Sequence, residues 1–209
     1  MIRQGGNISL LAFTLLLMIL HSTAAAHNCA VALAYPIDGI IIDGILNDWP
    51  EDMRRYPITF VEFGDPIRNS SDFDGSFRIG YDARENALYV AIEVRDESAV
   101  EDPIFPSNWQ KLDGCNVYID VLHKEKDSTA DQFITYSYHR TARVSKQAVE
   151  WEWKRQNDLY CYEWRLNVDK IAGSSVQLKA GMTIGWDIAI CDKDGDGSFS
   201  WVSWGRGGE

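Results

Sequence analysis

Residues 77–96 read FRIGYDARENALYVAIEVRD, and this stretch decides the fold class. Apolar side chains take every second position on both sides of the polar segment 82–87. Before that segment they are Phe77, Ile79 and Tyr81, and after it they are Leu88, Val90, Ile92 and Val94. A period of two with a bias to Val, Ile and Tyr is typical of half-buried strands. The short polar connection therefore predicts an antiparallel hairpin.

The same pattern recurs along the chain, whereas segments with a helical period of 3.6 residues are scarce. Further strands are predicted at 115–122, 132–139, 148–153, 160–168, 182–191 and 201–204, with a polar turn at 154–158. Residues 168–171 are predicted to form one helical turn. Many short strands separated by turns predict an all-β protein, an antiparallel β-sandwich of jelly-roll-like form.

The N-terminus has the layout of a secretory signal peptide over residues 1–26. Arg3 precedes the apolar run 8–20, and Ala-x-Ala patterns follow at 24–26 and 32–34, so cleavage could be as late as 34. The run is short for a membrane span, which needs about 20 residues, although an uncleaved anchor is the alternative. We expect an exported protein, periplasmic or extracellular, whose sandwich domain covers residues 35–209 and makes no membrane contact itself.

The charge balance limits the partners. The chain has 20 basic and 31 acidic residues, a net charge of −11. Nucleic-acid binding needs basic patches that neutralise phosphates, so this balance argues against it. It suits a neutral ligand or a divalent cation.

Three of the four cysteines lie in predicted strands. Export permits disulfides, and one pair among Cys115, Cys161 and Cys191 could bridge, but sequence alone does not pair them. Small buried apolar side chains are an equal interpretation.

The chain ends soon after its last predicted strand. Residues 205–209 (GRGGE) supply no closing element, so we expect an open edge strand and a sandwich truncated at its C-terminal edge. A C-terminal catalytic or signalling domain absent from this chain would fit that expectation.

Four segments together resemble the family 9 carbohydrate-binding modules of xylan-degrading enzymes and the related sensory ectodomains. They are 42–49 (IDGILNDW), 77–96, 109–120 (WQKLDGCNVYID), and 162–164 (YEW) with 184–192 (IGWDIAICD). The resemblance implies a jelly-roll-like β-sandwich with bound calcium.

The resemblance also implies where a sugar would bind. Trp109 matches a tryptophan that stacks on the ligand, and aromatic faces suit the apolar faces of pyranose rings. Asn116 stands where the family has a sugar-binding glutamate, and Ile134 lies near the family's arginine. A second stacking tryptophan lies beyond Trp204 in the family. Trp109, Asn116 and Trp204 are our candidate ligand-binding residues.

An acidic loop offers a cation site. Residues 192–198 read DKDGDGS, and carboxylates at alternating positions converge on a hard cation when the backbone turns tightly. We expect structural calcium held by Asp192, Asp194 and Asp196, with Asp113 and Asp120 as further ligands elsewhere. The match to an EF-hand is partial because its twelfth position is Ser203 rather than Glu. A solvated hairpin loop is the alternative.

No motif of a catalytic site is present. His123 and His139 lie on or beside predicted strands without GxSxG or HExxH nearby. We expect a non-catalytic module that binds plant-type polysaccharide or oligosaccharide ends, associated with carbohydrate catabolism by an attached or partner glycosidase. The alternative is the extracytoplasmic ligand-sensing domain of a membrane signalling protein, such as a histidine kinase. A purely structural sandwich is the third hypothesis.

Overall fold

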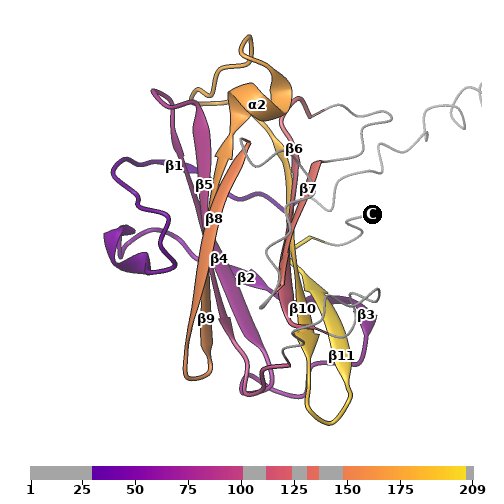
Figure 1. The fold of residues 1–209 in the computed structure, drawn as a ribbon. Coiled ribbons are helices and arrows are strands. Elements are labelled where there is room, and N and C mark those ends of the chain that lie inside the picture. Colours follow the sequence, from indigo (N-terminus) through magenta and orange to yellow (C-terminus); the bar gives the residue numbers. More distant parts are fainter. Residues whose placement is uncertain (1–29, 101–111, 124–130, 137–147, 206–209) are drawn as a thin grey trace, which may run out of the picture.

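Two β-sheets face each other in the computed structural model, which describes residues 30–100, 112–123, 131–136 and 148–205 (Figure 1). The first sheet has the strand order β1-β4-β5-β9-β8, and β2 also pairs with β4. Its strands are β1 (Tyr35–Pro36), β2 (Tyr56–Ile58), β4 (Asp74–Asp82), β5 (Ala87–Arg95), β8 (Val149–Gln156) and β9 (Leu159–Asn167).

The second sheet has the order β3-β11-β10-β6-β7. Its strands are β3 (Phe60–Gly64), β6 (Gly114–Asp120), β7 (Asp131–Tyr136), β10 (Gly185–Lys193) and β11 (Phe199–Ser203). The predicted β-sandwich is confirmed. One pairing is not antiparallel, because β1 runs parallel to β4.

The predicted hairpin is β4 and β5, which pair antiparallel over their full lengths. The register places Ile79 opposite Val90 and Tyr81 opposite Leu88, so the apolar positions share one face. Asn86 in the connection has φ of 50°, a conformation that Asn tolerates better than most residues.

The other predicted strands are also present, with shifted ends. The turn expected at 154–158 is shorter, because only Asn157 and Asp158 separate β8 from β9, and Asn157 has φ of 59°. The predicted helical turn is the short helix α2 (Val168–Ala172), whose N-cap Asn167 accepts a hydrogen bond from the backbone N–H of Lys170.

The core lies between the sheets and is built from the alternating side chains of both. Its fully buried members include Phe77, Val90, Ile92, Val117, Trp164 and Ile188. A second cluster covers the outer face of the first sheet. There Trp49 and Met53, flanking η1 (Leu46–Asp48), pack on Ala87, Tyr89 and Ala91 of β5.

The expectation of an open edge at the last strand is wrong. β11 lies between β10 and β3, so a strand from early in the chain covers it. The order of the strands along the chain does not reveal that β3 is the neighbour of β11 in the sheet.

The three cysteines of the described residues, Cys115, Cys161 and Cys191, lie on different faces and are free thiols. Cys115 faces the core between the sheets, whereas Cys191 belongs to an apolar cluster on the outer face of the second sheet. Cys161 lies on β9 of the other sheet, between the core residues Tyr160 and Tyr162 that point inward. No two of these three can bridge without backbone movement.

The signal peptide predicted at 1–26 lies outside the described residues. Among those residues, no helix is both long enough and apolar enough to span a membrane.

Candidate cation and ligand sites

Strand ends from both sheets bring a group of acidic side chains together. Asp96 follows β5, Asp113 precedes β6, and Asp192 and Asp194 lie at the end of β10. All four are buried, with 2 to 8% of their surfaces exposed. Burial of carboxylates is costly unless they are paired with charge or hydrogen-bonded, so each needs a partner.

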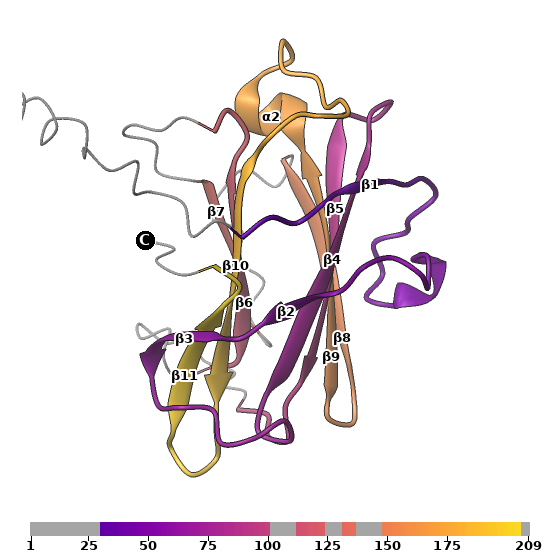
Figure 2. The ribbon, with the colours of Figure 1, turned by 180° about the vertical axis from the view of Figure 1, so that it is seen from behind.

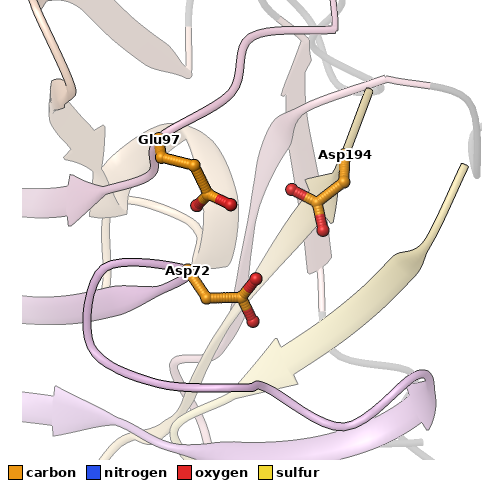
Figure 3. Close-up of side chains that lie close together, drawn as sticks. All are labelled: Asp72, Glu97 and Asp194. Carbon is orange, nitrogen blue, oxygen red and sulfur yellow. The ribbon is translucent and has the colours of Figure 1, made fainter. Parts of the chain in front are cut away.

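The carboxylates form two overlapping groups that share Asp194. One is Asp72, Glu97 and Asp194, and the other is Asp96, Asp192 and Asp194. In each group three carboxylate oxygens lie within 4.8 Å of one another. Figure 3 shows the side chains of the first group pointing toward one another from three separate segments.

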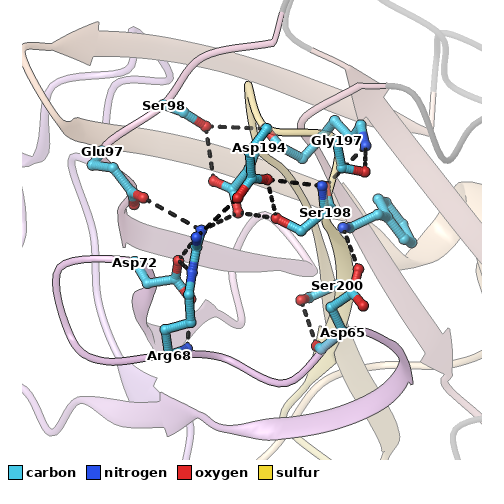
Figure 4. Close-up of polar contacts among 12 residues, drawn as sticks. Asp65, Arg68, Asp72, Glu97, Ser98, Asp194, Gly197, Ser198 and Ser200 are labelled. Atoms are coloured by element: carbon cyan, nitrogen blue, oxygen red, sulfur yellow. Dashed lines mark hydrogen bonds and ion pairs between the residues drawn. The ribbon is translucent and has the colours of Figure 1, made fainter.

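Arg68 already neutralises the first group. Its Nη2 lies 2.6 Å from Oδ1 of Asp72 and 2.6 Å from Oδ2 of Asp194, and 3.7 Å from Oε1 of Glu97 (Figure 4). The hydrogen bond with Asp72 raises the pKa of Arg68 further above its ordinary value. A guanidinium therefore occupies the place where a cation would be needed.

In the second group, Arg68 pairs with the shared Asp194 but with neither of the other two carboxylates. Among the described residues, no Lys or Arg forms an ion pair with Asp96 or Asp192, and Oδ1 of Asp192 is buried without a hydrogen bond. Burial, helped by the neighbouring carboxylates, raises the pKa of Asp96 to about 7 and that of Asp192 to about 8. An unpaired buried carboxylate of this kind is the environment that a bound cation would relieve.

Asp113 lies beside the second group and is fixed by the backbone. Its Oδ2 accepts from the N–H of Val100 and its Oδ1 from the N–H of Lys193, both at 2.8 Å. Burial and the charge of Asp96 raise the pKa of Asp113 to about 8 in spite of these bonds.

Of the three predicted calcium ligands, the structure brings Asp192 and Asp194 together and leaves Asp196 apart. Asp196 is exposed and belongs to neither group. It accepts a hydrogen bond from Ser198 and pairs with Nη1 of Arg68 at 3.0 Å. The loop turns at Gly197, whose φ is 100°, and Asp196 pairs with Arg68 rather than joining Asp192. Asp120, a further candidate, is half-buried at the far end of β6 from Asp113.

The predicted sugar contact Asn116 lies on the outer face of the second sheet. Its side chain is 1% exposed, and Nδ2 lies 3.6 Å from Sγ of Cys191. Oδ1 has no hydrogen-bond partner among the described residues. The same face carries an apolar patch of Leu112, Cys191, Phe199 and Trp201, of which Cys191 contacts Asn116.

Trp204 lies on the opposite face of that sheet. Its ring meets Phe77 edge-on at 5.3 Å and Tyr56 at 6.4 Å between centroids, so it packs toward the core. One sugar ring cannot contact both Trp204 and Asn116. Trp109 lies outside the described residues, as does the side chain of Ile134, whose backbone pairs with that of Asn116.

Comparison with known protein families matches residues 37–206 to the carbohydrate family 9 binding domain-like family. The chain belongs to this family. The match covers every described strand from β2 to β11, together with both acidic groups.

Two solved structures of a family 9 module from Caldicellulosiruptor kristjanssonii have the same fold. The complex with glucose has a TM-score of 0.62 at 16% identity, covering 83% of this chain and 89% of that one. The complex with cellotriose has a TM-score of 0.61 at 16% identity, covering 83% and 87%. A search of curated proteins finds no matching relative.

In this family 9 domain, the sequence pattern did not predict that Asp96 and Arg68 lie at the acidic groups. Asp96 is visible only as the polar residue that ends the strand 87–95, and Arg68 lies in a loop far from the acidic segment in sequence. Neither position has a local pattern that distinguishes it, because their neighbours are brought in by strand pairing.

Proposed function

We propose that this chain is a non-catalytic carbohydrate-binding module that recognises plant-type polysaccharide or oligosaccharide ends. The observation that carries the proposal is the family match, which extends through the segment containing Trp109 and Asn116. Structures of a module with the same fold contain glucose and cellotriose, which supports a sugar as the ligand class.

The outer face of the second sheet is the proposed contact surface. A sugar site combines aromatic surface with a few polar groups. This face carries the half-buried Trp201, and it also carries Asn116, which is 1% exposed and whose amide oxygen has no hydrogen-bond partner among the described residues. Trp109 comes three residues before Leu112, which belongs to the same apolar patch. Neutral Asn accepts more weakly than a carboxylate, so affinity depends mainly on aromatic contact.

Calorimetric titration with glucose, cellotriose and xylotriose tests this function. We expect binding of at least one sugar, and a loss of about tenfold or more in Trp109→Ala, because stacked aromatic contacts contribute about 1 kcal/mol beyond burial. Tyr35→Ala is the matched control, since Tyr35 is an exposed aromatic residue, 40% exposed, on β1 of the first sheet. No heat with any sugar, or equal losses in both variants, would refute the proposed site.

We further propose that Asp96, Asp192 and Asp194 bind a structural calcium ion. In this set Asp96 replaces Asp196 of the ligands predicted from the sequence. Three buried carboxylates converge there, and one oxygen of Asp192 has no partner. Oxygen ligands from carboxylates are those that calcium prefers. Arg68 contacts all three carboxylates of the neighbouring group but only Asp194 of this one, so the neighbouring group is the weaker candidate.

Two wider proposals rest on the sequence. Export to the periplasm or the exterior follows from the N-terminal layout, and mass spectrometry of the secreted protein would test cleavage after Ala26 or Ala34. Association with a glycosidase, or alternatively with a membrane signalling protein, would be tested by the sequence that follows residue 209 in the gene. A glycosidase domain supports the module, and a transmembrane segment supports the sensor.

A further inference from the structure

A cavity of about 830 Å³ opens between the two sheets, on the side opposite to the face that carries Asn116. The chain before β1 forms one wall, and the loop that leads into β10 forms another. Figure 2 shows the segment before β1 crossing from the second sheet to the first along this side. The volume is within the range of ordinary small-molecule sites, roughly 300–1,000 Å³.

Both walls are held by specific contacts. In the segment before β1, Ala32 and Ala34 pack on the core, and the N–H of Leu33 donates to the Tyr56 hydroxyl at 2.7 Å. In the second wall, the N–H of Leu178 donates to Oδ1 of Asn86 at 2.8 Å. The cavity is therefore largely formed before any ligand arrives, which lowers the cost of binding.

The lining is mostly apolar and aromatic. Ile79, Leu88, Met182, Trp186 and Trp204 are among its side chains. A pyranose placed here would bury several hydroxyls against aliphatic groups, and each unpaired hydroxyl costs binding energy. The cavity thus favours a ligand with an apolar body over a sugar.

Among the described residues of the lining, Lys179 supplies a positive charge. The described residues that line the cavity include Lys179 and His123 and no Asp or Glu. The chain as a whole has 31 acidic and 20 basic residues, so a lining without carboxylates departs from the general surface. The ammonium group of Lys179 at the rim attracts an anionic head group and disfavours a cationic one.

We propose that this cavity binds a small monocarboxylate with an apolar or aromatic body. The apolar body packs against Trp186 and Trp204, and the carboxylate faces Lys179 at the exposed rim. The site is separate from the proposed sugar surface, since Trp204 and Asn116 lie on opposite faces of the second sheet.

Three compounds with the same phenylpropyl group and different head groups distinguish the effect of charge from that of apolar contact. They are 3-phenylpropanoate, 3-phenylpropan-1-ol and 3-phenylpropylamine. We expect calorimetric affinity to decrease in that order. Lys179→Met should weaken binding of the carboxylate by roughly two- to fivefold and leave binding of the alcohol unchanged, the size expected for a solvent-exposed ion pair. Lys170→Met is the control, because Lys170 is an exposed residue of α2 that does not line the cavity.

Met182→Trp fills the cavity and should weaken all three probes while thermal unfolding shows that the variant is folded. Absence of binding by any probe, or unchanged affinity in a folded Met182→Trp, would overturn the site. Equal affinity for the carboxylate and the alcohol, with no effect of Lys179→Met, would overturn the assignment of an anionic head group. Cellotriose titrated in the same variants keeps its affinity, so the two sites are distinguished.

Discussion

The indole Nε1 of Trp49 donates a hydrogen bond of 2.8 Å to Oε1 of Glu163, which is fully buried on β9. The other oxygen, Oε2, accepts from the backbone N–H of Asp43 at 2.9 Å and of Gly44 at 2.6 Å. One carboxylate thus joins the segment IDGILNDW to the outer face of the first sheet. Burial raises the pKa of Glu163, and the three donated bonds oppose that rise.

Glu163→Gln should destabilise the domain by about 1–3 kcal/mol, because the amide presents an N–H group to donors that then lack an acceptor. Chemical denaturation measures the change. Glu150→Gln is the control, since the Glu150 side chain is 62% exposed and pairs only at the surface with Arg165, and should stay within about 0.5 kcal/mol. Equal effects of the two substitutions would contradict the role given to Glu163.

Gly44→Ala should cost about 2–5 kcal/mol, for two separate reasons. The residue has φ of 77°, and an added Cβ would lie 2.8 Å from the carbonyl carbon of Trp153 and 2.9 Å from the N of Lys154. Gly181→Ala separates the reasons, because Gly181 has φ of 80° with nothing within 4 Å of its added Cβ. Gly181→Ala should lower the free energy of unfolding by about 1–2 kcal/mol, the cost of the left-handed backbone conformation alone. Denaturation curves that do not differ between the variants would exclude a tight approach at Gly44.

Metal-free protein should lose stability as the pH rises from about 4 to about 8. The pKa of Asp is about 3.9 in an unfolded chain, but it is raised to about 7 for Asp96 and about 8 for Asp113 and Asp192 in the fold. The folded state therefore binds more protons than the unfolded state in that window, so stability falls as they are released. Thermal unfolding in EDTA at several pH values measures this, and a flat profile would contradict the raised pKa values of these three carboxylates.

Calcium should raise the unfolding temperature most at the alkaline end of that window, where the ligands are ionised and a native-state ligand stabilises by mass action. Asp192→Asn should abolish most of the shift. Asp196→Asn should retain it, because Asp196 pairs with Arg68 outside the group. If Asp196→Asn abolished the shift and Asp192→Asn retained it, the loop 192–198 would be the calcium site. If calcium did not raise the unfolding temperature of the unmutated protein, the proposal of bound calcium would be wrong.

The hairpin, the later strands and the single helical turn could all be predicted because each depends on local pattern. Alternation of apolar residues in 77–96 reflects a sheet with one face on the core, and the physical cause acts within a few residues. β1, β2 and β3 were not predicted. They have two, three and five residues, too few for a period to be recognised, and β2 contains Pro57.

The sequence by itself determined the class of the protein: an alternating, all-β domain of the family 9 type, with acidic residues gathered near the end of a late strand. Only the tertiary structure decided which charges meet. Long-range pairing places Asp96 beside Asp192, Arg68 between Asp72 and Asp194, and Glu163 under Trp49. The local pattern of apolar and polar residues predicts whether a side chain is buried. Which side chain it contacts depends on strand order and register across the sheets.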